Sequence, residues 1–333
     1  MKKYFLLACA FCVFGVADAA TIQFSSPDKK LQVTVADDGG RPTYRVVCGE
    51  TVFLEQSPLG LLTNIGDFSQ GMTLQESSFS SSPVSGHYEL PTIKRSKVDV
   101  RATKAVCPFY KDGKHIFDVV FHVSDHDVAF KYKMYPQGNT LCCVVKEETT
   151  GFVLPQGTTT FLCPQAGPMG GFARTSPSYE TSYTADGEMG KNGWGNGYTF
   201  PCLFRTGNKG WVLISETGVD SRYCASRLMG KDGGLYTIGF PQEGEYNGNG
   251  TACPGIALPG ETPWRTVTVG QTLAPIVETT IPYDVVEPLY EPSCRYVYGR
   301  GTWSWIIAGD NSMNYDEQKR YVDFAADMGY ESV

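Results

Sequence analysis

Residues 117–134 read FDVVFHVSDHDVAFKYKM, and this stretch decides the fold. From Phe117 onward apolar residues stand at every second position, the tetrad SDHD turns the chain, and the alternation returns from Phe130. A period of two is typical of a strand with one buried face. The stretch therefore predicts a long β-hairpin. His122 falls on the opposite face of the first strand, which we expect to point outward.

The same β pattern runs from Thr21 to about Glu287. Glycine (37), tyrosine (19) and phenylalanine (18) are abundant and only 19% of residues are charged, a balance that favours strands and turns over helices. Many strands separated by turn signals predict a mainly β fold of two packed antiparallel sheets. The further strand candidates are 31–35, 43–48, 97–103, 140–147, 158–163, 199–205, 210–216, 235–239 and 264–272.

The N-terminus resembles a secretory leader. Lys2 and Lys3 precede an apolar run over 4–16, and Ala17-Asp18-Ala19 has the small-x-small pattern of a cleavage site. We therefore expect a signal peptide over residues 1–19, cleaved near Ala19, and a periplasmic or secreted protein. A lipoprotein signal ending at Cys9 is the alternative, but the apolar stretch ahead of it is short.

Charge and cysteine content narrow the range of partners. After the leader 26 basic and 34 acidic residues remain, a net charge of −8, which argues against nucleic acid and anionic lipid. No later segment is long and apolar enough to span a membrane. Nine cysteines remain without a metal-binding spacing, so we expect most to be small buried residues and leave one or two disulfides open.

The last residues have a different pattern. Residues 301–306, GTWSWI, look like one strand, and 315–328 have the 3.6-residue apolar period of an amphipathic helix. Asn314 stands at the N-cap and Gly329 at the C′ position. Residues 330–333 begin a second strand. We interpret this as a β-α-β unit cut at its second strand, and we expect the chain to be the N-terminal piece of a larger protein.

Three stretches resemble glycoside hydrolase family 97, whose members are exported α-glucosidases and α-galactosidases. They are FHVSDHDVAFKY at 121–132, WVLISETGVDSRY at 211–223 followed by TPWRTVTVG at 262–270, and GRGTWSW at 299–305 with the helix after it. The resemblance implies a large antiparallel β-super-sandwich of the galactose-mutarotase type, followed by the first β-α-β stub of a truncated (β/α)8 barrel.

The resemblance also implies domain limits. We expect the sandwich over 20–287, a linker over 288–300 and the truncated start of the catalytic barrel over 301–333. Three prolines within 282–293 mark the linker region. The catalytic carboxylates of the family lie on later barrel strands, so the resemblance implies that this chain carries no catalytic residue.

The family uses a calcium ion, and the resemblance implies that one ligand is a glutamate from the sandwich. Glu180 lies in a long Gly-, Ser- and Tyr-rich loop over 164–198, where we would place that ligand. An ordinary exposed glutamate is the alternative. Glu216 is a weaker candidate, because its place on a strand suits a structural hydrogen-bonding group equally well. Calcium is thus the expected cofactor.

Aromatic and amide residues are candidates for sugar binding. Trp305 lies near the end of the expected strand, where barrel active sites form. Trp194, Asn196 and Tyr198 form an aromatic–amide stretch, but they could equally be turn residues with one anchoring ring. The adjacent acidic pairs at 37–38 and 147–148 point to opposite faces of a strand or turn, and we interpret both as solvated.

Taken together, these patterns predict the N-terminal part of an exported exo-acting α-glycosidase. It would hydrolyse terminal α-linked sugars of an oligosaccharide or α-glycoside with calcium assistance, with a slight preference for α-galactosidase over α-glucosidase. The chain by itself should be inactive. The alternative is a stand-alone carbohydrate-binding β-sandwich protein; an epimerase on the same fold is disfavoured because the four histidines are scattered.

Overall fold

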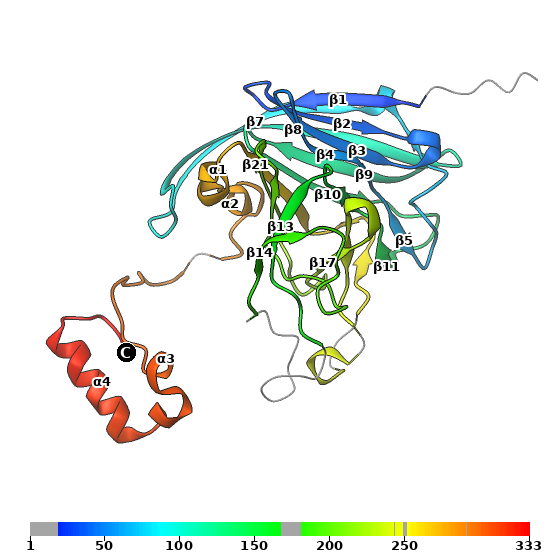
Figure 1. Cartoon of the computed structure of the whole chain (residues 1–333). Coiled ribbons are helices and arrows are strands. Elements are labelled where there is room, and N and C mark those ends of the chain that lie inside the picture. The colour runs from blue at the N-terminus through cyan, green and yellow to red at the C-terminus, as the bar shows by residue number, and fades with distance from the viewer. Residues whose placement is uncertain (1–18, 168–180, 243, 249–251, 291) are drawn as a thin grey trace, which may run out of the picture. The chain divides into compact units, whose positions relative to one another are not determined.

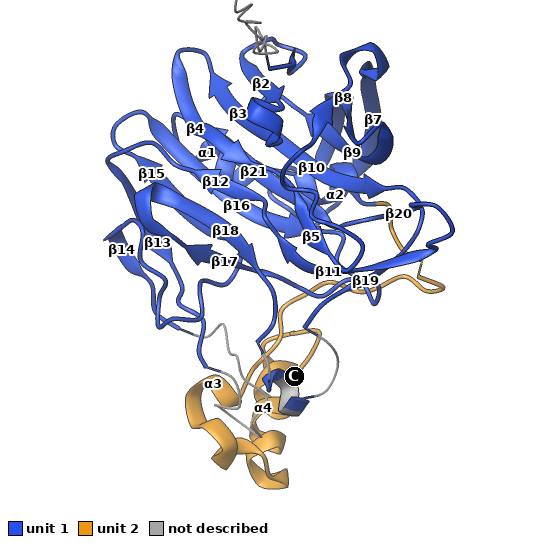
Figure 2. Ribbon diagram, turned by 90° about the vertical axis from the view of Figure 1, so that its right-hand side faces the viewer, with its two compact units in different colours: residues 1–286 blue, residues 287–333 orange. Residues whose placement is uncertain are grey.

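The computed structural model describes residues 19–167, 181–242, 244–248, 252–290 and 292–333. The predicted leader, apart from Ala19, and Glu180 lie outside these residues. The chain divides into two compact units, residues 1–286 and 287–333, which are described separately below (Figure 2).

The first unit is built on one large antiparallel sheet of eleven strands. It contains the hairpin of β9 (Lys114–Val123) and β10 (Asp127–Met134), in which Phe121 pairs with Phe130. The predicted hairpin is therefore confirmed. In order across the sheet the strands are β14 (Thr184–Glu188), β13 (Thr158–Leu162), β15 (Cys202–Thr206), β16 (Gly210–Thr217), β21 (Trp264–Gly270), β10 (Asp127–Met134), β9 (Lys114–Val123), β8 (Lys97–Lys111) and β6 (Thr73–Leu74), with β20 (Gly260–Glu261) also on β10 and β7 (Ser80–Glu89) also on β8.

Three smaller antiparallel sheets form the opposing layer (Figure 1). The first has four strands and the other two have three each. They are β1 (Thr21–Ser25), β2 (Leu31–Ala36), β3 (Thr43–Cys48) and β4 (Thr51–Pro58); then β19 (Gly255–Ala257), β11 (Cys142–Glu148) and β5 (Leu61–Thr63); then β12 (Gly151–Val153), β18 (Leu235–Gly239) and β17 (Arg227–Gly230). Short 3₁₀ turns lie at Asp38–Gly40, Glu76–Ser78, Asp232–Gly234 and Glu245–Gly248.

The two layers bury a single apolar core between them. Tyr44 of β3 contacts Phe130 of β10 with ring centroids 5.0 Å apart, and Phe24 of β1 contacts Phe121 of β9 at 5.1 Å. These tilted ring pairs add to the stabilisation from the buried area itself. The mainly β sandwich expected from the alternating pattern is confirmed, and each strand candidate between residues 31 and 272 corresponds to an observed strand.

The outer face of the large sheet is covered where the sequence predicted solvent. Helices α1 (Ala274–Glu278) and α2 (Ile281–Val285) follow β21 and pack on β21 and β10. Between them Thr279 Oγ1 donates to Asp127 Oδ1 of β10 at 2.7 Å. Residues 281–285, just before the expected linker over 288–300, form helix α2 with Pro282 in its first turn.

His122 of β9 does not point into solvent, so the outward assignment was wrong. Its side chain is buried, and neither ring nitrogen has a hydrogen-bond partner within the described structure. Alternation predicts which residues share a face, but it predicts exposure only if one face is uncovered. Here the neighbouring Val120 and Ala129 on that face are also buried.

Ten of the observed strands were not among the sequence candidates, and the edge strands β14 and β7 are two of them. β14 lies inside the stretch 164–198 that we expected to be a loop, and it pairs with β13 at the edge of the sheet. β7 pairs along the whole of 80–89 although its sequence contains Pro83 and Gly86. Both are exposed edge strands with little apolar alternation, which is where proline and polar residues are tolerated in a sheet.

The second unit contains α3 (Trp305–Ala308), a 3₁₀ turn (Gly309–Ser312) and α4 (Tyr315–Asp327). The predicted caps of α4 are confirmed: Asn314 Oδ1 accepts from the backbone N–H of Glu317 at 3.1 Å, and Gly329 has a φ of 63°. Gly301 and Ser332 form a parallel bridge, which is the pairing that a β-α-β unit requires.

The expected strand over 301–306 is wrong beyond its first residues. α3 begins at Trp305, whose indole Nε1 donates to Asp310 Oδ1 at 3.0 Å, so Trp305 does not lie at the end of a strand. Aromatic and β-branched residues favour a strand only when neighbouring strands pack against them. In the described residues this segment pairs with 331–332 alone.

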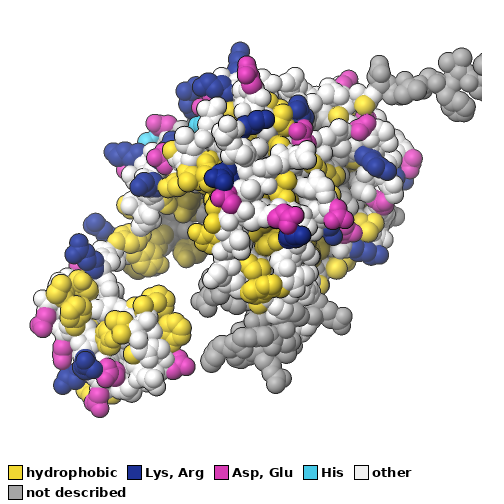
Figure 3. All heavy atoms as spheres, in the orientation of Figure 1, with side chains coloured by type: hydrophobic (Ala, Val, Ile, Leu, Met, Phe, Trp, Pro, Cys, Tyr) yellow, Lys and Arg dark blue, Asp and Glu magenta, His cyan; other side chains and the backbone are white. Residues whose placement is uncertain are grey.

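The surface agrees with the mixed charge of the sequence. On the face seen in Figure 3, Lys and Arg side chains are interspersed with Asp and Glu rather than gathered in one basic patch. No helix within the described ranges has the length and apolarity needed to cross a membrane.

Replacing His122 by Phe should reduce the loss in the free energy of unfolding as the pH becomes acidic. Burial lowers the pKa of His122, against a smaller opposing effect of Asp127. The unfolded chain therefore takes up a proton before the folded one, and the wild type loses stability as pH falls from about 7 to about 5, through the ordinary pKa of histidine. Urea unfolding at several pH values should show a shallower loss in His122→Phe. Parallel profiles for the two proteins would contradict this assignment.

Candidate functional site

A buried arginine joins three strands at the centre of the first unit. Arg265 of β21 is fully buried, and its Nε and Nη2 donate to the two carboxylate oxygens of Glu148 at 2.9 and 2.6 Å. Its Nη1 donates to Glu216 of β16 and, at 2.9 Å, to Ser226 Oγ. Such a planar two-pronged contact is the strongest form of arginine–carboxylate pairing.

The cluster holds one cation and two carboxylates, and Ser226 donates two further hydrogen bonds to Glu216. Burial alone would lower the pKa of Arg265, but the Glu148 carboxylate, together with Glu216, raises it above its ordinary value. Tyr223 also donates its hydroxyl to Glu148, at 3.3 Å. Burial raises the pKa of the neighbouring Tyr132, and the Glu148 charge raises it further, so that hydroxyl stays protonated. The cluster is thus a structural ion-pair network with no free acid or base.

Both acidic pairs that we interpreted as solvated are corrected by the structure. Glu148 is buried in the Arg265 cluster, while Glu147 is exposed. Asp37 is also buried: its two oxygens accept from the backbone N–H of Ala20 at 2.8 Å and of Leu74 at 3.0 Å. In each pair one carboxylate found partners from a distant part of the chain, which local alternation does not reveal.

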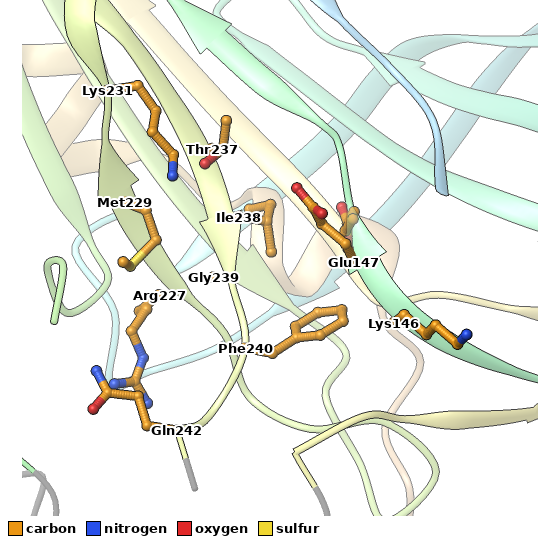
Figure 4. Close-up of a pocket in the computed structure, with 11 residues that line it drawn as sticks. Lys146, Glu147, Arg227, Met229, Lys231, Thr237, Ile238, Gly239, Phe240 and Gln242 are labelled. Carbon is orange, nitrogen blue, oxygen red and sulfur yellow. The ribbon is translucent and has the colours of Figure 1, made fainter. Parts of the chain in front are cut away.

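A cavity of about 230 Å³ lies beside this network, between β11 and the β17–β18 hairpin (Figure 4). Glu148 belongs both to its wall and to the Arg265 cluster. The remaining wall is mixed in character, with charged, polar and apolar groups facing one another. The residues that line it include Glu147, Arg227, Lys231, Thr237, Phe240 and Gln242.

Arg227 is the principal charged group of the cavity wall. Its side chain is 6% exposed, and its Nη2 lies 2.6 and 2.7 Å from the two oxygens of the buried Glu245. Glu245 in turn accepts from the backbone N–H of Gln242 at 2.8 Å. The Nε and Nη1 of Arg227 have no acceptor among the described residues. Both nitrogens have almost no accessible surface, so these two donors are buried behind the cavity wall rather than open to the cavity.

The predicted aromatic–amide stretch has mixed outcomes. Asn196 Oδ1 accepts from Gln242 Nε2, which ties this stretch to the cavity wall. Tyr198 is buried in the core and Trp194 is 63% exposed. Gly193, Gly195 and Gly197 all have positive φ, of 55°, 97° and 82°. Turn residues with one anchoring ring, the alternative left open by the sequence, describe this stretch better than a continuous sugar-binding surface.

Among the described residues, no cluster of acidic side chains marks the position of the expected calcium ion. Both oxygens of Glu216 are already engaged, with Ser226 and Arg265, which fits the structural role that was the alternative. No group of three or more His, Cys, Asp or Glu side chains within the described ranges is placed to hold a metal ion. Glu180 lies outside those ranges, so its assignment stays a prediction.

Sequence reasoning missed Arg227, Lys231, Thr237 and Gln242. Arg227 begins β17 and Thr237 lies within β18, while Lys231 and Gln242 follow the two strands, and no motif marks any of the four. One signal was available: basic residues at 227 and 231 bracket a short strand-like stretch, where buried strands usually carry apolar side chains. That signal alone would not have indicated a cavity.

Comparison with known proteins now identifies the family. Residues 24–288 match the sequence profile described as glycosyl-hydrolase 97 N-terminal. The chain therefore belongs to glycoside hydrolase family 97, as the resemblance implied, and it corresponds to the N-terminal part of that family's glycosidases.

Individual relatives cover the same region. The chain is 31% identical over 313 residues to a probable retaining alpha-galactosidase of Streptomyces bingchenggensis, covering 93% of this chain and 44% of that protein. A crystal structure of a beta-arabinopyranosidase is 52% identical, with a TM-score of 0.88, and covers 93% of this chain and 50% of that one. The chain thus spans about half the length of these relatives.

More distant structures share the fold. A family 97 enzyme from Pseudoalteromonas sp. strain K8, solved in complex with panose, has 18% identity and a TM-score of 0.71 over 93% of this chain and 46% of its own. The same enzyme in complex with acarbose gives 18% and 0.70, with the same shares covered.

Breaking the Arg265 cluster should be costly. Arg265→Met leaves Glu148 and Glu216 without their cation, so we expect a loss of about 3–5 kcal/mol in the free energy of unfolding. Glu148→Gln should cost less, because Arg265 keeps Glu216. The double variant Arg265→Met/Glu148→Leu should cost less than the sum of the corresponding single variants, since the fully buried Glu148 charge is then absent and Glu216 keeps its hydrogen bonds with Ser226. Urea unfolding measures all of these.

The matched control is Arg222→Met. Arg222 pairs with Asp220 on the surface, where solvent screens the interaction, so no measurable change is expected. If Arg265→Met unfolded at the same urea concentration as the Arg222 control, the cluster would not hold the sheets together.

Proposed function

We propose that this chain is the N-terminal sandwich portion of an exo-acting glycosidase that releases terminal α-linked sugars, with α-galactosides preferred over α-glucosides. The observation that carries the proposal is the family match over 24–288. The 31% identity to a probable retaining alpha-galactosidase supports the galactoside preference. The leader-like residues 1–19 support export.

The 52% identity to a beta-arabinopyranosidase favours a second candidate substrate. A β-L-arabinopyranoside has the ring stereochemistry of an α-D-galactopyranoside and lacks only the hydroxymethyl group of the hexose. A pocket that is closed at that position accepts the pentose and excludes the hexose, whereas an open pocket accepts both. Both candidates therefore share one site and differ in a single contact.

Glycosidic hydrolysis needs two carboxyl groups that flank the scissile bond, about 5–9.5 Å apart depending on the stereochemical outcome. Among the described residues of the first unit, Glu148, Glu216 and Glu245 are bound to arginine. The buried Asp37, Asp118 and Asp127 are hydrogen-bonded to backbone N–H groups or to neighbouring side chains. We therefore infer that the reacting acids and most of any calcium shell are supplied by parts of the longer protein, and that the described residues contribute scaffold and one wall for substrate.

The intact parent protein should hydrolyse nitrophenyl α-galactoside or nitrophenyl β-L-arabinopyranoside about 100-fold better than nitrophenyl α-glucoside in kcat/KM, because a site built to bind the axial C4 hydroxyl of the first two leaves that group unpaired with glucose. A chelator should abolish the activity, and added calcium should restore it. The isolated chain should turn over none of the three substrates.

Three outcomes would contradict the proposal. A preference for the α-glucoside would contradict the proposed substrate class. Full activity in excess chelator would contradict the proposed role of calcium. Turnover by the isolated chain would show that it carries its own catalytic acids. Sugar binding by a parent that hydrolyses no aryl glycoside would favour the alternative, a carbohydrate-binding protein without hydrolase activity.

A further inference from the structure

We propose that Cys224 and Cys253 form a disulfide bond that closes the chain segment carrying the β17–β18 hairpin. The sequence alone leaves one or two disulfides open and indicates no pairing. In the structure the two residues come from neighbouring loops, one before β17 and the other before β19, and both are half-buried. Export, which belongs to the proposed function, would bring the protein into a compartment where disulfides form and persist.

The first support is the distance between the two loops. The Cys224 sulfur lies 3.9 Å from the backbone oxygen of Ala252, the residue that precedes Cys253. Standard peptide dimensions then place that sulfur within about 6 Å of the Cys253 backbone nitrogen. The Cα atoms of bridged cysteines are usually about 4.4–6.8 Å apart. Closing the bond therefore needs a local adjustment of two side chains and not a rearrangement of the sheets.

The second support is that both loops are fixed beside the cysteines. Ser226 donates its backbone N–H and its hydroxyl to Glu216 at 2.9 and 2.6 Å, which ties the first loop to the Arg265 cluster. The backbone oxygen of Pro254 accepts from the N–H of Val145 in β11 at 2.9 Å, which ties the second loop to the opposing layer. Each cysteine is thus within two residues of an anchored position, and the fold sets their separation.

The environment of Cys224 agrees with this pairing. Burial raises the pKa of its thiol to about 12, and the nearby Cys253 adds a smaller increase. A thiol of high pKa is a poor leaving group in thiol–disulfide exchange, so a bond that contains Cys224 should resist reduction. We therefore expect a structural bridge rather than a redox switch.

A competing pair is Cys163 and Cys202. Burial raises the pKa of Cys202 and Cys163 adds to that increase, so these two thiols are also close. However, Phe161 pairs with Leu203, so the same register places Leu162 beside Cys202 and turns Cys163 to the opposite face of the sheet. Cys202 is accordingly buried and Cys163 only half-buried. No bond is expected between them.

The bond forms by thiol–disulfide exchange, with glutathione disulfide or a protein disulfide as the oxidant. One cysteine thiolate attacks the S–S bond of the oxidant and releases one of its sulfurs as a thiol. The second cysteine thiolate then displaces the other sulfur, and the Cys224–Cys253 bond forms. Each cysteine loses one hydrogen, and the oxidant is reduced to two thiols.

Disulfide mapping of the full chain tests the pairing. The purified protein is equilibrated with excess glutathione disulfide, its remaining thiols are alkylated, and it is digested with trypsin. Cleavage after lysine and arginine leaves the two cysteines in separate peptides, 223–227 and 232–265. Mass spectrometry should find these peptides joined, two hydrogen atoms lighter than their sum, and dithiothreitol should separate them.

Thermal unfolding gives a second measurement. A bond that closes a loop of about 30 residues restricts the unfolded chain, so dithiothreitol should lower the melting temperature of the wild type by about 5–10 °C. Cys224→Ser and Cys253→Ser should each melt lower than the oxidised wild type and should not respond to dithiothreitol. The double variant should melt no lower than the single variants, because they have already lost the bond.

Cys142→Ser is the matched control. Cys142 is an exposed cysteine of β11, so its variant should keep both the joined peptides and the response to dithiothreitol. Alkylation or glutathione adducts at Cys224 and Cys253, a bond between Cys163 and Cys202 in place of theirs, or a dithiothreitol response that survives in Cys224→Ser would each overturn the assignment. None of these readouts involves hydrolysis, so a parent protein that cleaves glycosides without this bond would refute the disulfide and leave the proposed function standing.

Discussion

The rest of the sandwich depends on one buried cation. Arg265 sits in the middle strand of the large sheet and holds Glu148 at the end of β11 and Glu216 on β16. Removing three charges from water is costly, and only close geometry with every oxygen paired offsets that cost. The pairing therefore demands one relative position of the large sheet and of the small sheet that carries β11. Apolar packing alone would tolerate small slips between the layers.

This constraint also shapes the cavity between β11 and the β17–β18 hairpin. Glu148 is both the main partner of Arg265 and part of the cavity wall, so the ion pair and the cavity share one element. A second pair, Arg227 with Glu245, holds the opposite wall and links it to Gln242 and the turn at Asn196. The cavity is thus bounded by groups whose positions are set by buried charge.

Most of the architecture could be predicted from the sequence, but the chemistry of the site could not. Period-two alternation found the β9–β10 hairpin and most strands of the large sheet, and cap residues found α4, because these signals are local. Strands β1, β4 and β5 also line the core and were not among the candidates. Glu148 and Arg265, which pair with each other, are 117 residues apart in the sequence, and no spacing rule connects them. The predictions for His122 and Trp305 were wrong for a related reason, since both depend on tertiary structure. The outer face of the large sheet is covered, and residues 301–306 have few neighbouring strands to pair with. The family resemblance predicted the class of function, whereas no single residue did.

Amide hydrogen exchange tests most directly whether the Arg265 cluster is the centre of the structure. Core segments exchange only through global unfolding, whereas segments outside it open locally. The account predicts that peptides covering β16 and β21 exchange last, well after the edge strands β7 and β14. Exchange of β21 as early as that of β14 would contradict it, because the strand that carries Arg265 would then open without the rest of the fold.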